Sequence, residues 1–177
     1  MLKKRIYETI ITTFSENKPN AAPMGIYFIE DDRAIVKIYK GSKTYENLKK
    51  TKKCAINIVY DPILFLVYAL KEKKEDIEVF FDSGIPVLKD CSGYILAEVL
   101  EMEEKENKGI FLLKVIKKVS LSDFPEPFSR GLGAAVELAI ELTRGRRDNI
   151  GKYLRVMKKC LEEEKFKRIE EFLGEYL

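Results

Sequence analysis

The sequence predicts a mainly β protein with some helix, in which an antiparallel barrel is followed by a small helical unit. Six segments carry the β-branched and aromatic residues typical of strands, and most of the connections between them are short. The character of the chain changes at Pro125-Glu126-Pro127, after which apolar residues recur at helical spacing. We therefore expect a barrel domain over residues 1–124 and a helical unit over residues 125–177.

The first strands flank an unusual stretch. Ile6–Phe14 reads as a strand buried on both faces, and Ile26–Glu30 forms a predicted hairpin with Ala34–Tyr39. Between the first two segments lies KPNAAPMG, in which Pro23 removes a backbone donor and Gly25 removes a side chain. This stretch is either the ragged start of an edge strand or a backbone against which something flat lies.

The remaining segments of the barrel domain are predicted from their residue patterns as well. Cys54–Tyr60 is expected to be a fourth strand, and Pro62 to begin an apolar helix with proline in its first turn. Gly93–Glu103 and Gly109–Val119 are joined by five polar or charged residues and read as one long hairpin. Six strands with one helix among them favour closure into a barrel.

Composition excludes several kinds of site. The chain of 177 residues has a net charge of +3 and no histidine, so it has no Ser-His-Asp triad, no Cys-His pair and no histidine ligand for a metal. Cys54, Cys91 and Cys160 form neither a metal motif nor a complete disulfide framework, which favours a reducing compartment. The longest apolar run, Ile63–Leu70, is too short to span a bilayer, and the amino terminus lacks a signal-peptide core. We expect a cytoplasmic protein without a metal site or a membrane partner.

The segment between the third and fourth strands carries a candidate phosphate site. Ser42 is a favourable N-cap for a helix, and Thr44 and Asn47 fall one turn apart on the same helix face. Free amides at the helix start, the hydroxyls of Ser42 and Thr44 and the charge of Lys43 together favour phosphate binding. A capped surface helix is the alternative.

The candidate phosphate site and the unusual stretch together predict flavin mononucleotide (FMN). A phosphate cradle near a disrupted strand is the combination that this cofactor needs, because its flat ring lies against backbone where side chains are small. Ala21, Ala22 and Gly25 supply such small residues.

The sequence resembles the archaeal FMN-binding split-barrel proteins of unknown function, which are similar to flavin reductases and pyridoxamine-phosphate oxidases. The resemblance rests on four segments spread over most of the chain: YETIITTF at 7–14, NAAPMG at 20–25, KTYENL at 43–48 and SRGLGAAVELAIELTRGRR at 129–147. It implies an antiparallel, Greek-key-like split β-barrel that forms a homodimer and holds FMN at the interface between subunits.

The resemblance also implies roles for individual residues. Thr44 and Asn47 match the phosphate-side positions, and Ala21, Ala22 and Met24 match positions beside the isoalloxazine ring. Asn57, an amide in an apolar strand, is either a cofactor contact or a buried asparagine bonded to backbone. The full set of expected cofactor-binding residues is Thr12, Thr13, Asn20, Ala21, Ala22, Met24, Ser42, Lys43, Thr44, Asn47 and Asn57.

We expect an FMN-binding homodimer that acts as an oxidoreductase. No residue is assigned a catalytic role, because the chain has no histidine and no evident acid–base dyad. One alternative is a reductase of the same fold that uses a deazaflavin cofactor, and another is a non-catalytic module that binds or senses flavin. A nucleic-acid-binding barrel is disfavoured because no strand interleaves aromatic with basic residues.

Overall fold

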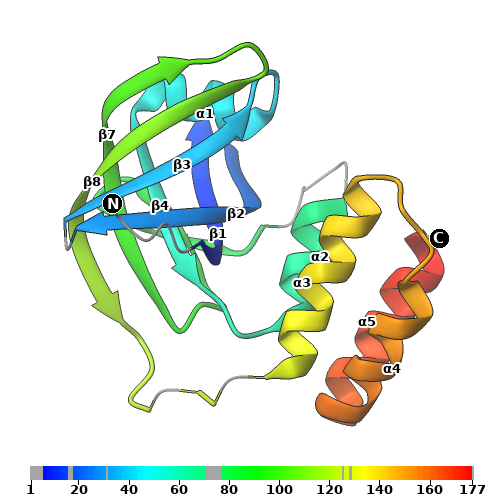
Figure 1. Ribbon diagram of the computed structural model, residues 1–177. Coiled ribbons are helices and arrows are strands. Elements are labelled where there is room, and N and C mark those ends of the chain that lie inside the picture. The colour runs from blue at the N-terminus through cyan, green and yellow to red at the C-terminus, as the bar shows by residue number, and fades with distance from the viewer. Residues whose placement is uncertain are drawn as a thin grey trace. The chain divides into compact units, whose positions relative to one another are not determined.

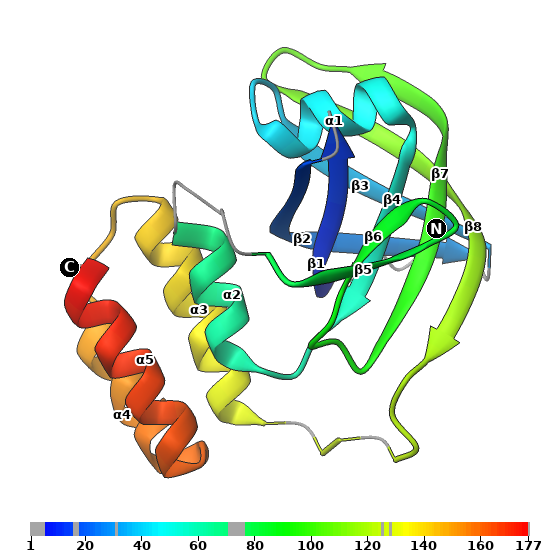
Figure 2. The same ribbon diagram turned by 180° about the vertical axis from the view of Figure 1, so that it is seen from behind.

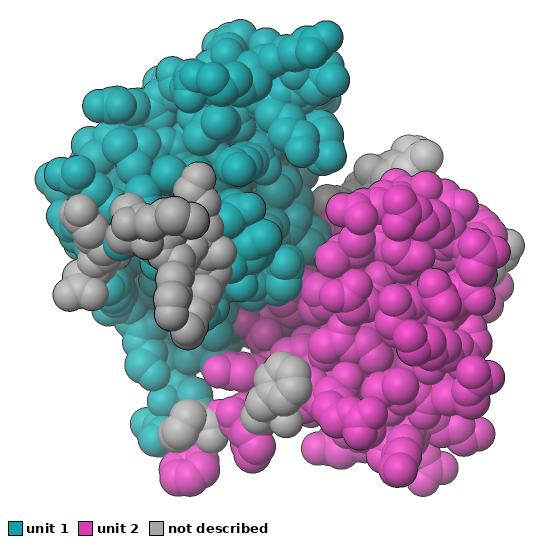
Figure 3. Space-filling model, viewed as in Figure 1, with its two compact units in different colours: residues 1–58, 74–123 teal, residues 59–73, 124–177 magenta. Residues whose placement is uncertain are grey.

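The computed structural model describes residues 6–15, 18–30, 32–70, 77–124, 126–127 and 129–176. The chain divides into two compact units (Figure 3). One comprises residues 1–58 and 74–123, and the other comprises residues 59–73 and 124–177. Within the described residues, no helix is long and apolar enough to cross a membrane.

The first unit is built on a closed six-stranded barrel (Figure 1), which confirms the expected fold class. Going round the barrel the strands follow the order β1-β2-β3-β8-β7-β4, and every neighbouring pair is antiparallel. The bounds are β1 (Tyr7–Ser15), β2 (Lys18–Glu30), β3 (Arg33–Tyr39), β4 (Lys53–Ile58), β7 (Gly93–Glu104) and β8 (Lys108–Ser120).

Strand β2 begins earlier than its sequence suggests. It pairs with β1 from Lys18 onwards, but it pairs with β3 only from Ile26, so residues 18–25 have no strand of the described chain on their second edge. Pro19 and Pro23 fit there because proline cannot donate to a ladder and is confined to such edges. A side chain at Gly25 would meet Ile6, whose Cγ2 lies 2.7 Å from the position of a Cβ.

Helix α1 (Lys43–Thr51) connects β3 to β4 and packs on the barrel core. Gly41 adopts a φ of +80° in the turn before it, and Ser42 caps it by accepting a hydrogen bond from the Tyr45 amide at 3.3 Å. Tyr45 and Leu48 are buried with the apolar side chains of the barrel. The helix thus rests on the barrel through one face, as its spacing predicts.

A short hairpin that the sequence analysis did not predict lies beside the barrel (Figure 2). It consists of β5 (Val79–Asp82) and β6 (Ile85–Leu88), joined at Ser83 and Gly84, which have φ values of 53° and 74°. All four residues of β6 are buried, and this strand packs against β1 and β4. The Asp82 carboxylate accepts hydrogen bonds from Tyr94 and Lys117, both at 2.6 Å, and so fastens the hairpin to β7 and β8.

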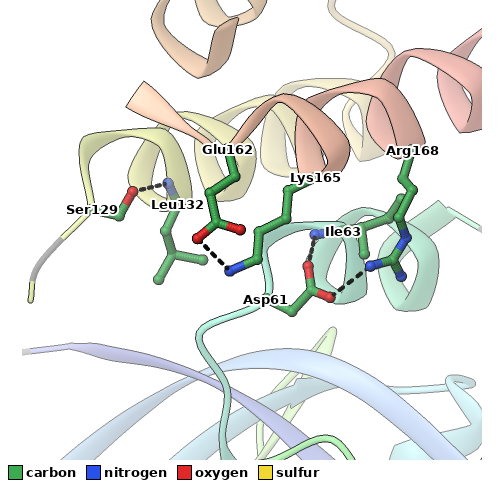
Figure 4. Close-up of polar contacts among 7 residues, drawn as sticks. All are labelled: Asp61, Ile63, Ser129, Leu132, Glu162, Lys165 and Arg168. Atoms are coloured by element: carbon green, nitrogen blue, oxygen red, sulfur yellow. Dashed lines mark hydrogen bonds and ion pairs between the residues drawn. The ribbon is translucent and has the colours of Figure 1, made fainter. Parts of the chain in front are cut away.

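The second unit consists of four helices, α2 (Pro62–Leu70), α3 (Arg130–Thr143), α4 (Ile150–Cys160) and α5 (Glu163–Tyr176). Its core joins apolar residues of all four helices. Figure 4 shows two polar contacts that support it: Ser129 caps α3 by accepting from the Leu132 amide at 3.3 Å, and Asp61 accepts from Arg168 at 3.3 Å. Helix α2 therefore packs with the helices that follow residue 124, although it lies between barrel strands in the sequence.

Candidate functional site

Four polar side chains from three elements form a buried cluster where α1 meets the β1–β2 hairpin. Asn20 donates to the Thr44 hydroxyl at 3.0 Å, and Asn47 donates to the Thr13 hydroxyl at 3.2 Å. Thr13 and Asn20 are themselves partners across the strands, and each of the four side chains is 5% exposed or less. The structure therefore brings together four of the expected cofactor-binding residues and orients them by mutual hydrogen bonds.

The N-terminus of α1 lies directly beside this cluster. Ser42 Oγ caps the Tyr45 amide and donates to the Tyr39 carbonyl at 2.8 Å, so its hydroxyl is already in use. Within the described residues, no hydrogen bond uses the backbone N–H of Lys43 or Thr44. The Lys43 side chain is exposed and forms no ion pair with a described residue. Two free amides and one free cation at a helix start form a site that suits an anion.

Neighbouring charges on this side of the barrel are already neutralised. Glu104 lies 3.1 Å from Lys40 and 2.9 Å from Lys49, and it accepts the Tyr45 hydroxyl at 3.0 Å. Hydrogen bonds from Lys49, Lys40 and Tyr45, in that order, lower the pKa of Glu104 to about 2. Burial and then this same contact raise the pKa of Tyr45. Sequence reasoning missed Glu104, which is 59 positions from Tyr45, and no local signal connects the two.

Thr12 and Asn57 lie apart from this cluster and hold β6 in place. Asn57 donates to the Ile10 carbonyl at 2.8 Å and to the Thr12 hydroxyl at 3.0 Å, and its oxygen accepts the Leu88 amide at 2.9 Å. Thr12 in turn donates to the Pro86 carbonyl at 2.5 Å. Both side chains are fully buried, and their hydrogen-bonding groups are occupied within the protein. This geometry matches the expectation of a buried asparagine bonded largely to backbone.

The small residues of β2 lie opposite β1. Ala21 pairs with Thr12 and is fully buried, whereas Ala22 pairs with Ile11 and is half-buried. Met24 shares the face of Ala22 and packs against the barrel core. One stretch of β2 thus carries the half-buried side chains of Ala22 and Met24 and the unpaired edge of residues 18–25. This stretch lies next to Asn20, which donates to Thr44.

Comparisons with known proteins agree on one family and one fold. The family described as "Protein of unknown function (DUF447) N-terminal domain" matches residues 7–122. An uncharacterised protein of Methanocaldococcus jannaschii is 32% identical over 153 residues, which cover 82% of this chain and 77% of the relative.

Solved structures extend this likeness to three dimensions. An FMN-bound protein of Methanosarcina mazei, assigned to the same family, is 28% identical with a TM-score of 0.82, over 99% of this chain and 97% of that one. A flavoredoxin from Methanosarcina acetivorans is 20% identical with a TM-score of 0.60, over 68% and 72% of the two chains. The flavoredoxin supports the fold alone.

Proposed function

The chain belongs to the DUF447 family of proteins, and from this premise we propose that it is an FMN-binding flavoprotein that works as a homodimeric oxidoreductase. The observation that carries the proposal is the start of α1, where the amides of Lys43 and Thr44 form no hydrogen bond within the described residues and the Lys43 side chain is exposed. The same helix carries Thr44 and Asn47 of the buried polar cluster. The FMN-bound relative from Methanosarcina mazei supports the choice of ligand.

The residues at this site fit the two ends of the cofactor. A phosphate suits the α1 N-terminus, because unpaired amides and a lysine complement its negative charge. The Thr44 hydroxyl accepts the Asn20 amide hydrogen and keeps its own proton to donate to a phosphate oxygen. The open edge of β2 and the small side chain of Ala22 suit a flat ring.

When bound, FMN supplies the capacity to accept and pass on electrons, and the protein supplies position and electrostatics. Asn20 and Thr13 hold Thr44 and Asn47 in fixed orientations, so these groups lose little freedom when a ligand arrives. Glu104 occupies Lys40 and Lys49, which leaves Lys43 as the cation of this helix start that can meet a phosphate.

The test compares FMN with riboflavin, which lacks the phosphate. We expect the protein to bind FMN more tightly than riboflavin, and Lys43→Gln to weaken FMN binding about tenfold, or about 1.4 kcal/mol, with little effect on riboflavin. Quenching of flavin fluorescence measures both affinities. Lys50→Gln removes a matched charge from the other end of α1 and should leave FMN binding unchanged. Equal affinities for FMN and riboflavin would contradict the assignment of the phosphate site.

The oxidoreductase part of the proposal has its own measurement. Bound flavin should lose its absorbance under anaerobic conditions when NADH, NADPH or a reduced deazaflavin is added, and should recover it when an acceptor is supplied. A protein that retains FMN but is reduced by none of these donors favours the non-catalytic module. Preference for an oxidised deazaflavin over FMN in the binding assay favours the deazaflavin-dependent reductase.

A further inference from the structure

A single carboxylate at the end of β7, that of Glu104, contacts three side chains on and beside α1. It lies 3.1 Å from the Lys40 ammonium and 2.9 Å from the Lys49 ammonium, and it accepts the Tyr45 hydroxyl at 3.0 Å. Lys40 precedes the helix, Tyr45 lies in its first turn and Lys49 lies in its last turn. One residue of the barrel wall therefore contacts α1 along its length.

The turn between β7 and β8 contacts the same side of α1 through other groups. The Lys40 amide donates to the Asn107 carbonyl at 3.1 Å. The Tyr45 ring packs edge-on against Phe111, and its Cε2 lies 2.6 Å from the position of a Cβ on Gly109, so the ring requires glycine there. In Figure 1 the loop that joins β7 to β8 lies at the same end of the barrel as α1.

The buried polar cluster holds α1 from its other side. Thr44 and Asn47 form hydrogen bonds with the β1–β2 hairpin, whereas Tyr45 and Lys49, four positions apart, share the face that meets Glu104. The helix is therefore held between two hairpins, and both of them determine where its first amides lie.

We propose that Glu104 is a positioning residue for the phosphate site: without touching the ligand, it holds the start of α1 where the helix amides and Lys43 meet the phosphate. The inference rests on the proposed FMN site. One exposed ion pair contributes little to stability, but a carboxylate shared by two ammonium groups and a hydroxyl restricts three side chains at once. A helix start that is already fixed loses less freedom when it binds a ligand.

Positioning and electrostatics predict effects of opposite sign at Glu104. Hydrogen bonds from Lys49, Lys40 and Tyr45 lower the pKa of Glu104 to about 2, so its carboxylate is ionised at neutral pH. If this residue acted through its charge alone, its removal would strengthen FMN binding, because a negative charge would be lost and two lysines would be released near an anion. If it positions α1, its removal weakens FMN binding although the site becomes more positive.

The experiment measures the affinities of the full-length protein for FMN and riboflavin by quenching of flavin fluorescence. Glu104→Gln keeps an acceptor for the Tyr45 hydroxyl but loses both ion pairs, and Glu104→Ala loses all three contacts. We expect the FMN affinity to fall about threefold and about tenfold, respectively, with the riboflavin affinity unchanged. Glu103→Gln is the matched control, because it removes the same charge from the neighbouring position, where the carboxylate pairs with Lys105. It should change neither affinity.

Tighter or unchanged FMN binding by Glu104→Ala would overturn the positioning role. Equal losses of FMN and riboflavin affinity would overturn it too, because they would mark Glu104 as a residue that supports the fold alone. Tyr45→Phe removes one contact without changing the charge and should lower the FMN affinity about threefold. Its effect and that of Glu104→Ala should be less than additive. A wild type that binds FMN no better than riboflavin would instead contradict the phosphate site itself.

Discussion

Thr44 and Asn47 mark how far single residues could be predicted. Helical spacing placed them on one face of α1, and both are buried there. Their hydrogen bonds to Asn20 and Thr13 could not be predicted, because these residues lie 24 and 34 positions away in the sequence. They meet Thr44 and Asn47 only when α1 packs on the β1–β2 hairpin. The interpretation of Gly25 as a small residue that leaves room for a flat ligand did not anticipate its neighbour, because the space beside Gly25 is taken by Ile6 of the same chain.

The contact between Thr13 and Asn47 allows a test at this scale. Thr13→Val removes the hydroxyl that accepts the Asn47 amide hydrogen and leaves that donor buried without its partner. We expect the free energy of unfolding in urea to fall by about 1–3 kcal/mol. Thr143→Val is the matched control at an exposed position and should change stability by less than about 0.5 kcal/mol. An unchanged Thr13→Val protein would show that this hydrogen bond adds nothing to stability.

At the scale of elements, the strands with long apolar or alternating patterns were predicted and the short ones were not. Strands β5 and β6 have four residues each, and Pro86 lies inside β6, so neither presents a strand pattern of ordinary length. The Ser83-Gly84 pair between two apolar segments was the available hairpin signal. The start of β2 was not predicted, because Pro19 and Pro23 normally argue against a strand. They are accommodated here because residues 18–25 pair with a strand on one side only, and this is known only from the assembled barrel.

The fastening of the β5–β6 hairpin should depend on pH. Hydrogen bonds from Lys117, Tyr94 and Ser83 lower the pKa of Asp82 from 3.8 to about 2. Because the folded state favours the ionised carboxylate, the stabilisation is present above pH 3.8 and is lost as the pH falls through about 2. Asp82→Asn should therefore lower the urea midpoint at pH 6, and the difference from wild type should close near pH 2.

The control for this prediction is Asp90→Asn, which removes an exposed carboxylate beyond the end of the same hairpin. Its urea midpoint should follow that of the wild type at both pH values. A difference for Asp82→Asn that persists unchanged to pH 2 would mean that the Asp82 carboxylate does not fasten the hairpin.

At the scale of the whole molecule, six strands and their short links were sufficient to predict a barrel. The closing pairs, β1 with β4 and β3 with β8, could not be predicted, because they join strands that are distant in the sequence. The position of α2 was equally inaccessible. Its sequence is apolar on all sides, so periodicity does not reveal that it packs mainly on α3.

Truncation tests the organisation of the chain into units. A protein that ends at residue 124 retains α2 but loses α3 and α5, which cover Ile63, Leu66 and Leu70. We expect it to aggregate, and we expect a version with residues 59–73 replaced by a Gly-Ser linker to be more soluble. Light scattering and circular dichroism distinguish these results. A soluble, cooperatively folding fragment 1–124 with α2 intact would contradict the assignment of α2 to the helical unit.

The packing of α2 on α3 has a consequence for the barrel that acts through connectivity. The two helices lie on either side of the segment that contains β5 to β8, so their contact holds the ends of that segment together in the manner of a reversible crosslink. When the helical unit unfolds, the restraint from the α2–α3 contact is lost and the barrel has to close a longer free loop. The entropic cost of that closure rises by about 0.6 kcal/mol for each doubling of the loop length. We therefore expect the unfolding of the two units to be coupled, so that a destabilising substitution in the helices also lowers the stability of the barrel through the chain connections.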